Sequence, residues 1–215
     1  SYGDGNLAEH IQDLTEIVSL MVDGLTAQEK AIIDKEIIAT YKKHGWSIKG
    51  KNTRVKGKTY PLLKDLYKSL RLSRHKKLYT RMEKFVKGSL SSVFDSQTNI
   101  KLDNRLVVFD IKDLPESIRQ IMMVIAANWV YNQVKKEPQK RLLVIDEAWM
   151  LLEHEESARF IAGLTRRARK YYLGVSIISQ QANDFLNNVY GKAIASQASL
   201  RLLMRQDTTT INEVV

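Results

Sequence analysis

Four short, mostly apolar runs, separated by longer helical patterns, constrain the fold of this 215-residue sequence more than any other feature. None of them alternates apolar with polar residues, and unalternated runs are typical of strands buried on both faces of a parallel sheet. Strands that alternate with helices in this way predict an α/β domain. The runs are Leu106–Phe109, which continues into Asp110, then Leu142–Ile145, Gly174–Ser179 and Leu200–Met204.

The N-terminal part of the chain has only helical spacing. Residues 6–23 carry apolar side chains on one helical face, and Thr26 with Glu29 has the form of a capping box that opens a second helix. Pro61 is expected near the start of a third helix, and Ser73–Lys87 is expected to form a fourth. We therefore expect three segments: a helix in residues 1–25, a basic all-helical subdomain in 26–95, and an α/β core in 100–215.

Composition excludes several classes of site. The sequence has no cysteine, which excludes a disulfide framework and cysteine-ligated zinc, and its four histidines show no metal-ligand spacing. No apolar run approaches the roughly 18 residues that span a bilayer. The net charge of +10 is concentrated between Tyr41 and Leu90, where sixteen Lys and Arg residues face two acidic ones, Asp65 and Glu83. This basic segment predicts either solvated helix faces or a surface for nucleic acid, acidic proteins or anionic lipid.

The strongest chemical motif is Asp146-Glu147, directly after the apolar run Leu142–Ile145. Open α/β sheets bind ligands at the carboxyl ends of their strands. An Asp there can hold a Mg²⁺ ion that bridges ATP phosphates, and the Glu after it can activate the attacking water. This is the form of a Walker B motif, although acidic residues also follow buried strands by chance. Trp149 is expected to pack beneath this pair, with stacking on adenine as the alternative.

Two further features lie close to this motif, and the whole group spans 36 positions from Asp146 to Gln181. Gln180 and Gln181 end the next apolar run, where an amide can bind a γ-phosphate or the attacking water, although a turn or helix cap also explains amides there. Near the end of the intervening helix lie Arg166, Arg167 and Arg169. The helix dipole alone favours cations at this position. The functional alternative is an arginine finger that stabilises transition-state charge in a neighbouring subunit.

Taken together, the segments LLVIDEAWMLL, FIAGLTRRARKYYLGVSIISQQANDF and ASLRLLMRQD resemble the VirB-four/TraC/TrbE-like ATPases of type IV secretion. More distantly they resemble the HerA and FtsK DNA translocases. Residues 7–93 look like the helical subdomain that these secretion ATPases insert into their motor core. The resemblance implies a partial RecA-like P-loop NTPase core with a mostly parallel sheet and an inserted all-helical subdomain. It also implies that residues 1–25 lead out of an N-terminal motor part.

The resemblance implies roles for particular residues and for the whole protein. Its family is made of Mg-ATP-driven, hexamer-forming motors on the cytoplasmic face of the bacterial inner membrane. There they work with other subunits of the type IV secretion complex in pilus assembly and substrate transfer in conjugation. By this resemblance Asp146 is the Mg²⁺ ligand and Glu147 is the catalytic base. The γ-phosphate sensor is Gln180, with the neighbouring Gln181 as the second candidate. The arginine finger is Arg169, with Arg166 and Arg167 as the alternative candidates.

The sequence departs from this family in one respect, because the phosphate-binding pattern G-x-x-x-x-G-K-[ST] occurs nowhere in it. Gly3–Asn6 lacks the lysine, and Gly50–Thr53 lies in a basic stretch without a preceding strand. We therefore expect that the loop precedes residue 1, and that this chain alone binds ATP poorly and hydrolyses it negligibly. Two other functions stay open: a DNA translocase of the HerA/FtsK kind, with DNA on the basic segment 41–90, and a catalytically silent docking module.

Overall fold

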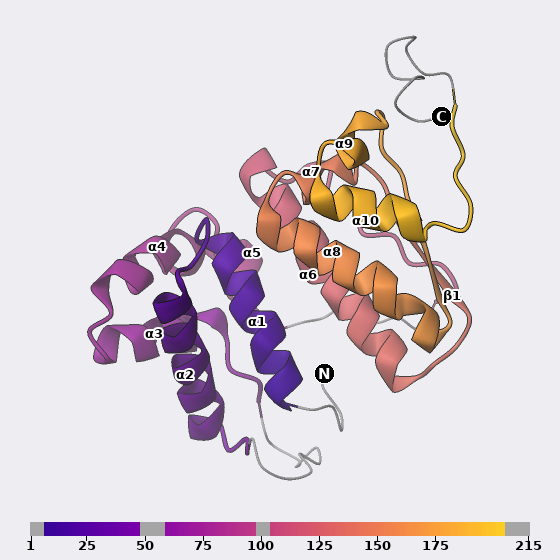
Figure 1. Ribbon diagram of the computed structural model, residues 1–215. Coiled ribbons are helices and arrows are strands. Elements are labelled where there is room, and N and C mark those ends of the chain that lie inside the picture. Colours follow the sequence, from indigo (N-terminus) through magenta and orange to yellow (C-terminus); the bar gives the residue numbers. More distant parts are fainter. Residues whose placement is uncertain (1–6, 48–58, 98–103, 205–215) are drawn as a thin grey trace. The chain divides into compact units, whose positions relative to one another are not determined.

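The computed structural model describes residues 7–47, 59–97 and 104–204, and the chain divides into two compact units. Unit 1 comprises residues 1–108 and unit 2 comprises residues 109–215 (Figure 1). Among the described residues, no helix is both long and apolar enough to cross a membrane.

Unit 1 is helical throughout its described part, as its sequence spacing predicts. Thr26 accepts a hydrogen bond from the backbone N–H of Glu29 at 3.2 Å, and the Glu29 carboxylate accepts one from the Thr26 N–H at 2.9 Å, so the predicted capping box is present. A second acidic residue, Asp65, accepts from the Leu62 N–H at 2.9 Å and so satisfies a donor at the next helix start. The helices are α1 (Leu7–Met21), α2 (Ala27–Lys43), α3 (Leu63–Leu72), α4 (Lys76–Val86) and α5 (Ser91–Phe94).

The core of unit 1 holds one buried carboxylate among its apolar side chains. Ile33 on α2, Leu70 on α3 and Phe85 on α4 are fully buried. Glu36 on α2 is also buried, and its two oxygens accept hydrogen bonds from Ser69 at 2.6 Å and from Ser73 at 2.8 Å. These bonds satisfy a group that is costly to bury unpaired, and they fix α2 against α3.

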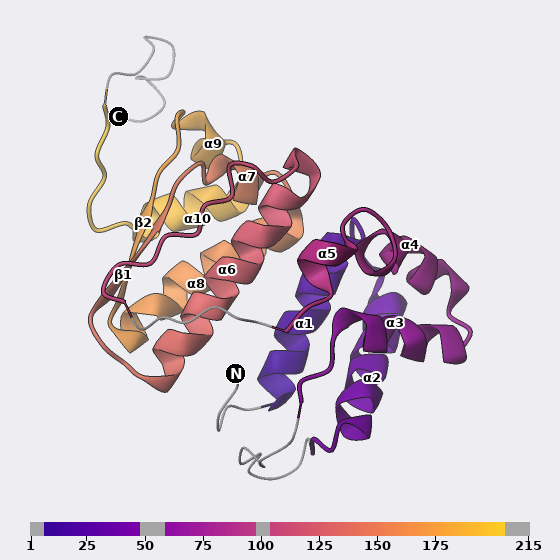
Figure 2. The ribbon, with the colours of Figure 1, turned by 180° about the vertical axis from the view of Figure 1, so that it is seen from behind.

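Unit 2 contains a two-stranded parallel sheet whose crossover connection is helical. Strand β1 (Arg141–Ile145) pairs with β2 (Leu173–Ile177), with Ile145 opposite Ile177. Helix α8 packs against β2 and against α6 and α10 (Figures 1 and 2). The helical elements are α6 (Glu116–Lys136), α7 (Trp149–Leu152), α8 (Glu155–Ala168), the 3₁₀ turn η1 (Arg169–Tyr171), α9 (Asn183–Leu186) and α10 (Val189–Gln197). The predicted α/β class is therefore confirmed.

The expectation that this sheet is buried on both faces is wrong for the described residues. Leu142 and Val144, which point to one face of β1, are 68% and 52% exposed, whereas Ile145 on the other face is buried. Within the described residues of unit 2, this face of β1 is left largely exposed. An uncovered apolar sheet face of this kind is a site where further protein can pack.

Two of the four predicted strands are not strands in the structure. The run Leu106–Asp110 and the run Leu200–Met204 have no regular secondary structure. Leu106 is 79% exposed and Leu202 is 82% exposed. A strand exists only through hydrogen bonds to a neighbouring strand, and neither run has such a neighbour in the described part of the chain. The predicted segment boundaries at residues 25/26 and 95/100 stay predictions.

Candidate active site

The predicted acidic pair and the predicted glutamine lie together at the carboxyl edge of the sheet. Beyond the regular ladder, the Ile178 N–H donates to the Ile145 carbonyl at 2.9 Å, and the Ala148 N–H donates to the Ile178 carbonyl at 3.0 Å. These two bonds hold the chain after β1 beside the chain after β2. Residues 146–147 and residue 180 are thereby placed on one edge, where parallel α/β sheets carry their ligands.

Glu147 receives a hydrogen bond on each carboxylate oxygen. The Gln180 side-chain amide donates to Oε1 at 2.8 Å, and the Trp149 indole N–H donates to Oε2 at 2.5 Å. The Gln180 bond first, and then the Trp149 bond, hold the pKa of Glu147 below its ordinary value because both donors favour the charged form. Glu147 also adopts a left-handed backbone conformation, with φ of 52°, which is uncommon for a residue other than glycine.

Asp146 is exposed to solvent at the same edge, and its Oδ1 accepts a hydrogen bond from the Glu147 N–H at 2.9 Å. This short-range bond orients the carboxylate. No cluster of three or more metal-binding side chains occurs among the residues that the structure describes. Mg²⁺ in nucleotide sites needs no such cluster, since one or two carboxylates, waters and the substrate phosphates complete its coordination. The donor set around Asp146 therefore fits a Mg²⁺ ion carried by a nucleotide.

The structure separates the two glutamine candidates. Gln180 contacts Glu147, whereas the Gln181 side chain is exposed and only its backbone carbonyl is engaged, by the Asp184 N–H at 3.3 Å. Ser179 donates to the Asp184 carboxylate, which ties the segment after β2 to the start of α9. Gln180 is thus the amide that this fold brings to the acidic pair.

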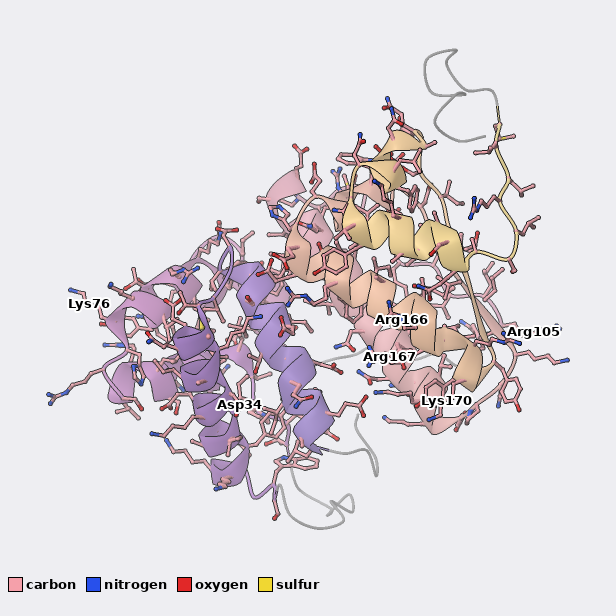
Figure 3. The ribbon with its side chains drawn as sticks, in the orientation of Figure 1. Asp34, Lys76, Arg105, Arg166, Arg167 and Lys170 are labelled. Carbon is pink, nitrogen blue, oxygen red and sulfur yellow. The ribbon has the colours of Figure 1, made fainter. Side chains whose placement is uncertain are left out.

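The arginine candidates lie at the opposite end of the sheet. Arg166 and Arg167 are exposed on the last turn of α8 (Figure 3). Arg169 is also exposed and begins η1, which precedes β2. The Arg141 N–H donates to the Tyr172 carbonyl at 3.2 Å, so this is the amino edge of the strands. A five-residue strand is roughly 17 Å long. The structure therefore brings none of the three to Glu147 of the same chain.

Trp149 is a site residue that sequence reasoning placed nearby but did not assign a polar role. It begins α7, whose other three residues are buried. The sequence feature that pointed to a place near the site is its position two residues after Glu147. A hydrogen bond from the indole depends on how α7 turns away from the strand, and that turn includes the left-handed conformation of Glu147.

The glycine-rich stretches of the sequence do not supply a phosphate-binding loop in the described structure. Gly45 follows the end of α2, with a left-handed φ of 80°, and so it terminates a helix. A phosphate-binding loop instead connects a strand to a helix. Residues 3–6 and 50–53, the other stretches considered, lie outside the described residues.

Side chains that can bind a metal ion and activate water, here an aspartate, a glutamate and a glutamine at the carboxyl edge of a parallel sheet, are typical of nucleotide-binding α/β proteins. Residues 62–212 match the family described as the TraG P-loop domain. Because this match covers well over half of the 215 residues, the chain belongs to that family.

Relatives of known class agree with the family match. The chain is 24% identical over 139 residues to the type IV secretion system protein virB4 of Bartonella quintana (strain Toulouse), and equally to that of Bartonella henselae. Each alignment covers 63% of this chain and 18% of the relative. The solved structure of VirB4 of Thermoanaerobacter pseudethanolicus superimposes with a TM-score of 0.84 and 26% identity, over 97% of this chain and 60% of that one. These findings confirm the resemblance to VirB-four/TraC-like ATPases and the partial RecA-like fold.

Proposed function

We propose that this chain is part of an ATP-hydrolysing motor that energises type IV secretion, including conjugative transfer. The observation that carries the proposal is the hydrogen-bonded group of Glu147, Gln180 and Trp149 beside Asp146, at the edge of the sheet where nucleotides bind. The family match and the two virB4 relatives support a secretion ATPase over other NTPases.

Each site residue has a role in this proposal. Asp146 would hold the metal through its free carboxylate oxygen, and Glu147 would orient and deprotonate water. Gln180 would report the state of the site to the segment that leads to α9. When bound, ATP supplies the phosphoryl group that is transferred, and its Mg²⁺ ion supplies the positive charge that neutralises the phosphate oxygens. Residues outside these 215 would supply the phosphate-binding loop.

The placement of the arginines favours action between subunits. Arg166, Arg167 and Arg169 are exposed at the amino edge of the sheet, remote from the acidic pair of their own chain. In a ring of identical subunits, one of them would reach a neighbouring site and stabilise transition-state charge there. We propose Arg169 for this role, and a hexamer docked peripherally on the cytoplasmic face of the inner membrane among other secretion subunits.

The test measures Mg-dependent ATP hydrolysis by a longer form of the protein that includes a phosphate-binding loop. The Glu147→Gln variant is expected to bind ATP and to lose at least about a hundredfold in kcat, since it removes the general base. The matched control is Glu153→Gln, an exposed glutamate beyond α7 that contacts no site residue. If the longer protein neither binds nor hydrolyses ATP, the docking module becomes the better account.

A DNA translocase is the second candidate, and one observation favours it. Lys42 and Lys43 on α2 and Lys76 on α4 are exposed, and none of the three has an ion-pair partner among the described residues. Lys77 on α4 is exposed as well, although its charge also helps to lower the pKa of Glu29. Unpaired surface cations release counterions from DNA phosphates on binding, so affinity would fall steeply with salt. DNA-stimulated hydrolysis that is lost when these lysines are changed to glutamine would support this candidate, and DNA-independent hydrolysis would exclude it.

A further inference from the structure

We propose that Trp149 is a positioning residue for Glu147, and that its indole N–H fixes the direction of the carboxylate that activates water. The proposal rests on the proposed function for the role of Glu147. It goes beyond that function because it assigns a role to Trp149, which belongs neither to the acidic pair nor to the glutamine candidates. The bond that carries it joins the Trp149 Nε1 to the Glu147 Oε2 at 2.5 Å.

Trp149 stands on an element that is anchored on several sides. The Ala148 N–H donates to the carbonyl of Ile178 at the end of β2, and the Leu152 carbonyl accepts from the Asn188 side chain at 2.9 Å. Between them, Leu151 is buried in the core of unit 2. A donor on a fixed element holds its acceptor with little loss of further conformational entropy, which is what a positioning group requires.

The second donor to Glu147 comes from a different segment. Gln180 follows β2, whereas Trp149 follows β1, and each binds a different oxygen of the same carboxylate. Rotation of the carboxylate plane would break both bonds at once. The two donors together therefore fix the orientation of the plane, while the remaining lone pairs face solvent, to which the side chain is partly exposed.

Packing alone does not account for a tryptophan at this position, because a phenylalanine would fill similar apolar space. Trp129 on α6 illustrates the packing role: its ring meets that of Phe109 edge to face at 5.9 Å. In Trp149 the polar end of the ring is directed at a carboxylate. The substitution Trp149→Phe removes this donor and keeps an aromatic ring, and Trp129→Phe is the matched control.

The direct test uses the 215-residue chain labelled with ¹⁵N at tryptophan, with no nucleotide present. We expect Glu147→Ala, which removes the acceptor, to shift the Trp149 indole N–H signal upfield and to speed its exchange with solvent, because the hydrogen bond to Oε2 is lost. The signals of Trp46 and Trp129 should not change in this variant. A Trp149 signal that is the same in the parent and in Glu147→Ala would overturn the proposal.

The second readout is the pH profile of ATP hydrolysis in the longer form of the protein. Trp149→Phe is expected to lower kcat about tenfold, the lower end of what loss of an outer-shell partner costs, with KM nearly unchanged. Removal of a donor also raises the pKa of the carboxyl group, so the acidic limb should move to higher pH. A purely structural role would lower the unfolding temperature without moving this limb, and Trp129→Phe should leave it in place.

The outcomes separate this inference from the proposed function. Hydrolysis that survives Glu147→Gln would refute the assigned role of Glu147. Hydrolysis that is lost in Glu147→Gln but has the parent's rate and pH profile in Trp149→Phe would refute only the positioning role of Trp149.

Discussion

In its proposed role as a general base, Glu147 combines two properties that oppose each other. Its two hydrogen-bond donors keep it ionised at neutral pH, but they also make it a weaker proton acceptor, because the same bonds that lower its pKa must be weakened on protonation. The site therefore favours orientation of water over proton affinity. Any motion that withdrew Gln180, the larger contributor, would raise the basicity of Glu147 without moving its backbone.

The first prediction follows from this balance. Gln180→Leu removes the larger of the two donors, so the pKa of Glu147 should rise toward its ordinary value. A carboxyl group with a depressed pKa stabilises the fold above its unfolded-state pKa, and that contribution disappears as pH falls through the folded-state pKa. The variant should therefore lose less stability on acidification than the parent. A ¹³C-detected titration of the Glu147 carboxyl group measures the pKa directly.

The control for this titration is Gln181→Leu, because that exposed side chain does not contact Glu147. An equal rise of the pKa in both variants would show that the Gln180 amide is not the group that holds the carboxylate.

Much of the candidate site could be predicted because its residues directly follow apolar runs. The position of Asp146 at a strand end is a property of the sequence order, and so is that of Gln180. The bond between Gln180 and Glu147 needed only the parallel register in addition. The hydrogen bond from Trp149 to Glu147 could not be predicted in this way, since it depends on a left-handed residue and on the rotamer of one side chain.

At the scale of elements, the helices were predictable and half of the strands were not. A helix satisfies its hydrogen bonds within itself, so local signals such as Thr26 with Glu29 define it. A strand depends on a partner strand, which is often far away in the sequence. Strands β1 and β2 have each other, whereas the apolar runs at 106–110 and 200–204 have no strand beside them in the described part of the chain.

Two glycines in helices of unit 2 give a prediction at this scale. At Gly191 on α10, an added Cβ would lie 2.5 Å from the backbone oxygen of Phe185, so Gly191→Ala should destabilise the unit by about 1 to 3 kcal/mol. At Gly163 on α8, the nearest atom to an added Cβ is the end of the Arg167 side chain at 3.5 Å, which is ordinary contact. Gly163→Ala should therefore stabilise the helix by up to about 1 kcal/mol.

Urea unfolding of both glycine variants, followed by far-ultraviolet circular dichroism, measures these changes as shifts in the midpoint. Opposite signs are expected. A stabilising Gly191→Ala would mean that α9 and α10 do not pack as closely as the structure places them.

At the scale of the whole molecule, the proposed function assigns this chain one half of a nucleotide site. In that proposal the carboxyl edge of the sheet carries the metal-binding and water-activating groups, whereas the described residues include no glycine-rich loop between a strand and a helix that could hold the phosphates. Phosphoryl transfer depends mostly on positioning and on charge stabilisation around the phosphates. A correctly formed Glu147 is therefore insufficient for catalysis.

The last prediction is that the 215-residue chain alone hydrolyses Mg-ATP no faster than its Glu147→Gln variant, as measured by phosphate release. The reason is that water activation contributes little when the phosphates are not held in line with it. Hydrolysis that requires Glu147 in the chain alone would contradict this and would mean that its own residues bind the phosphates.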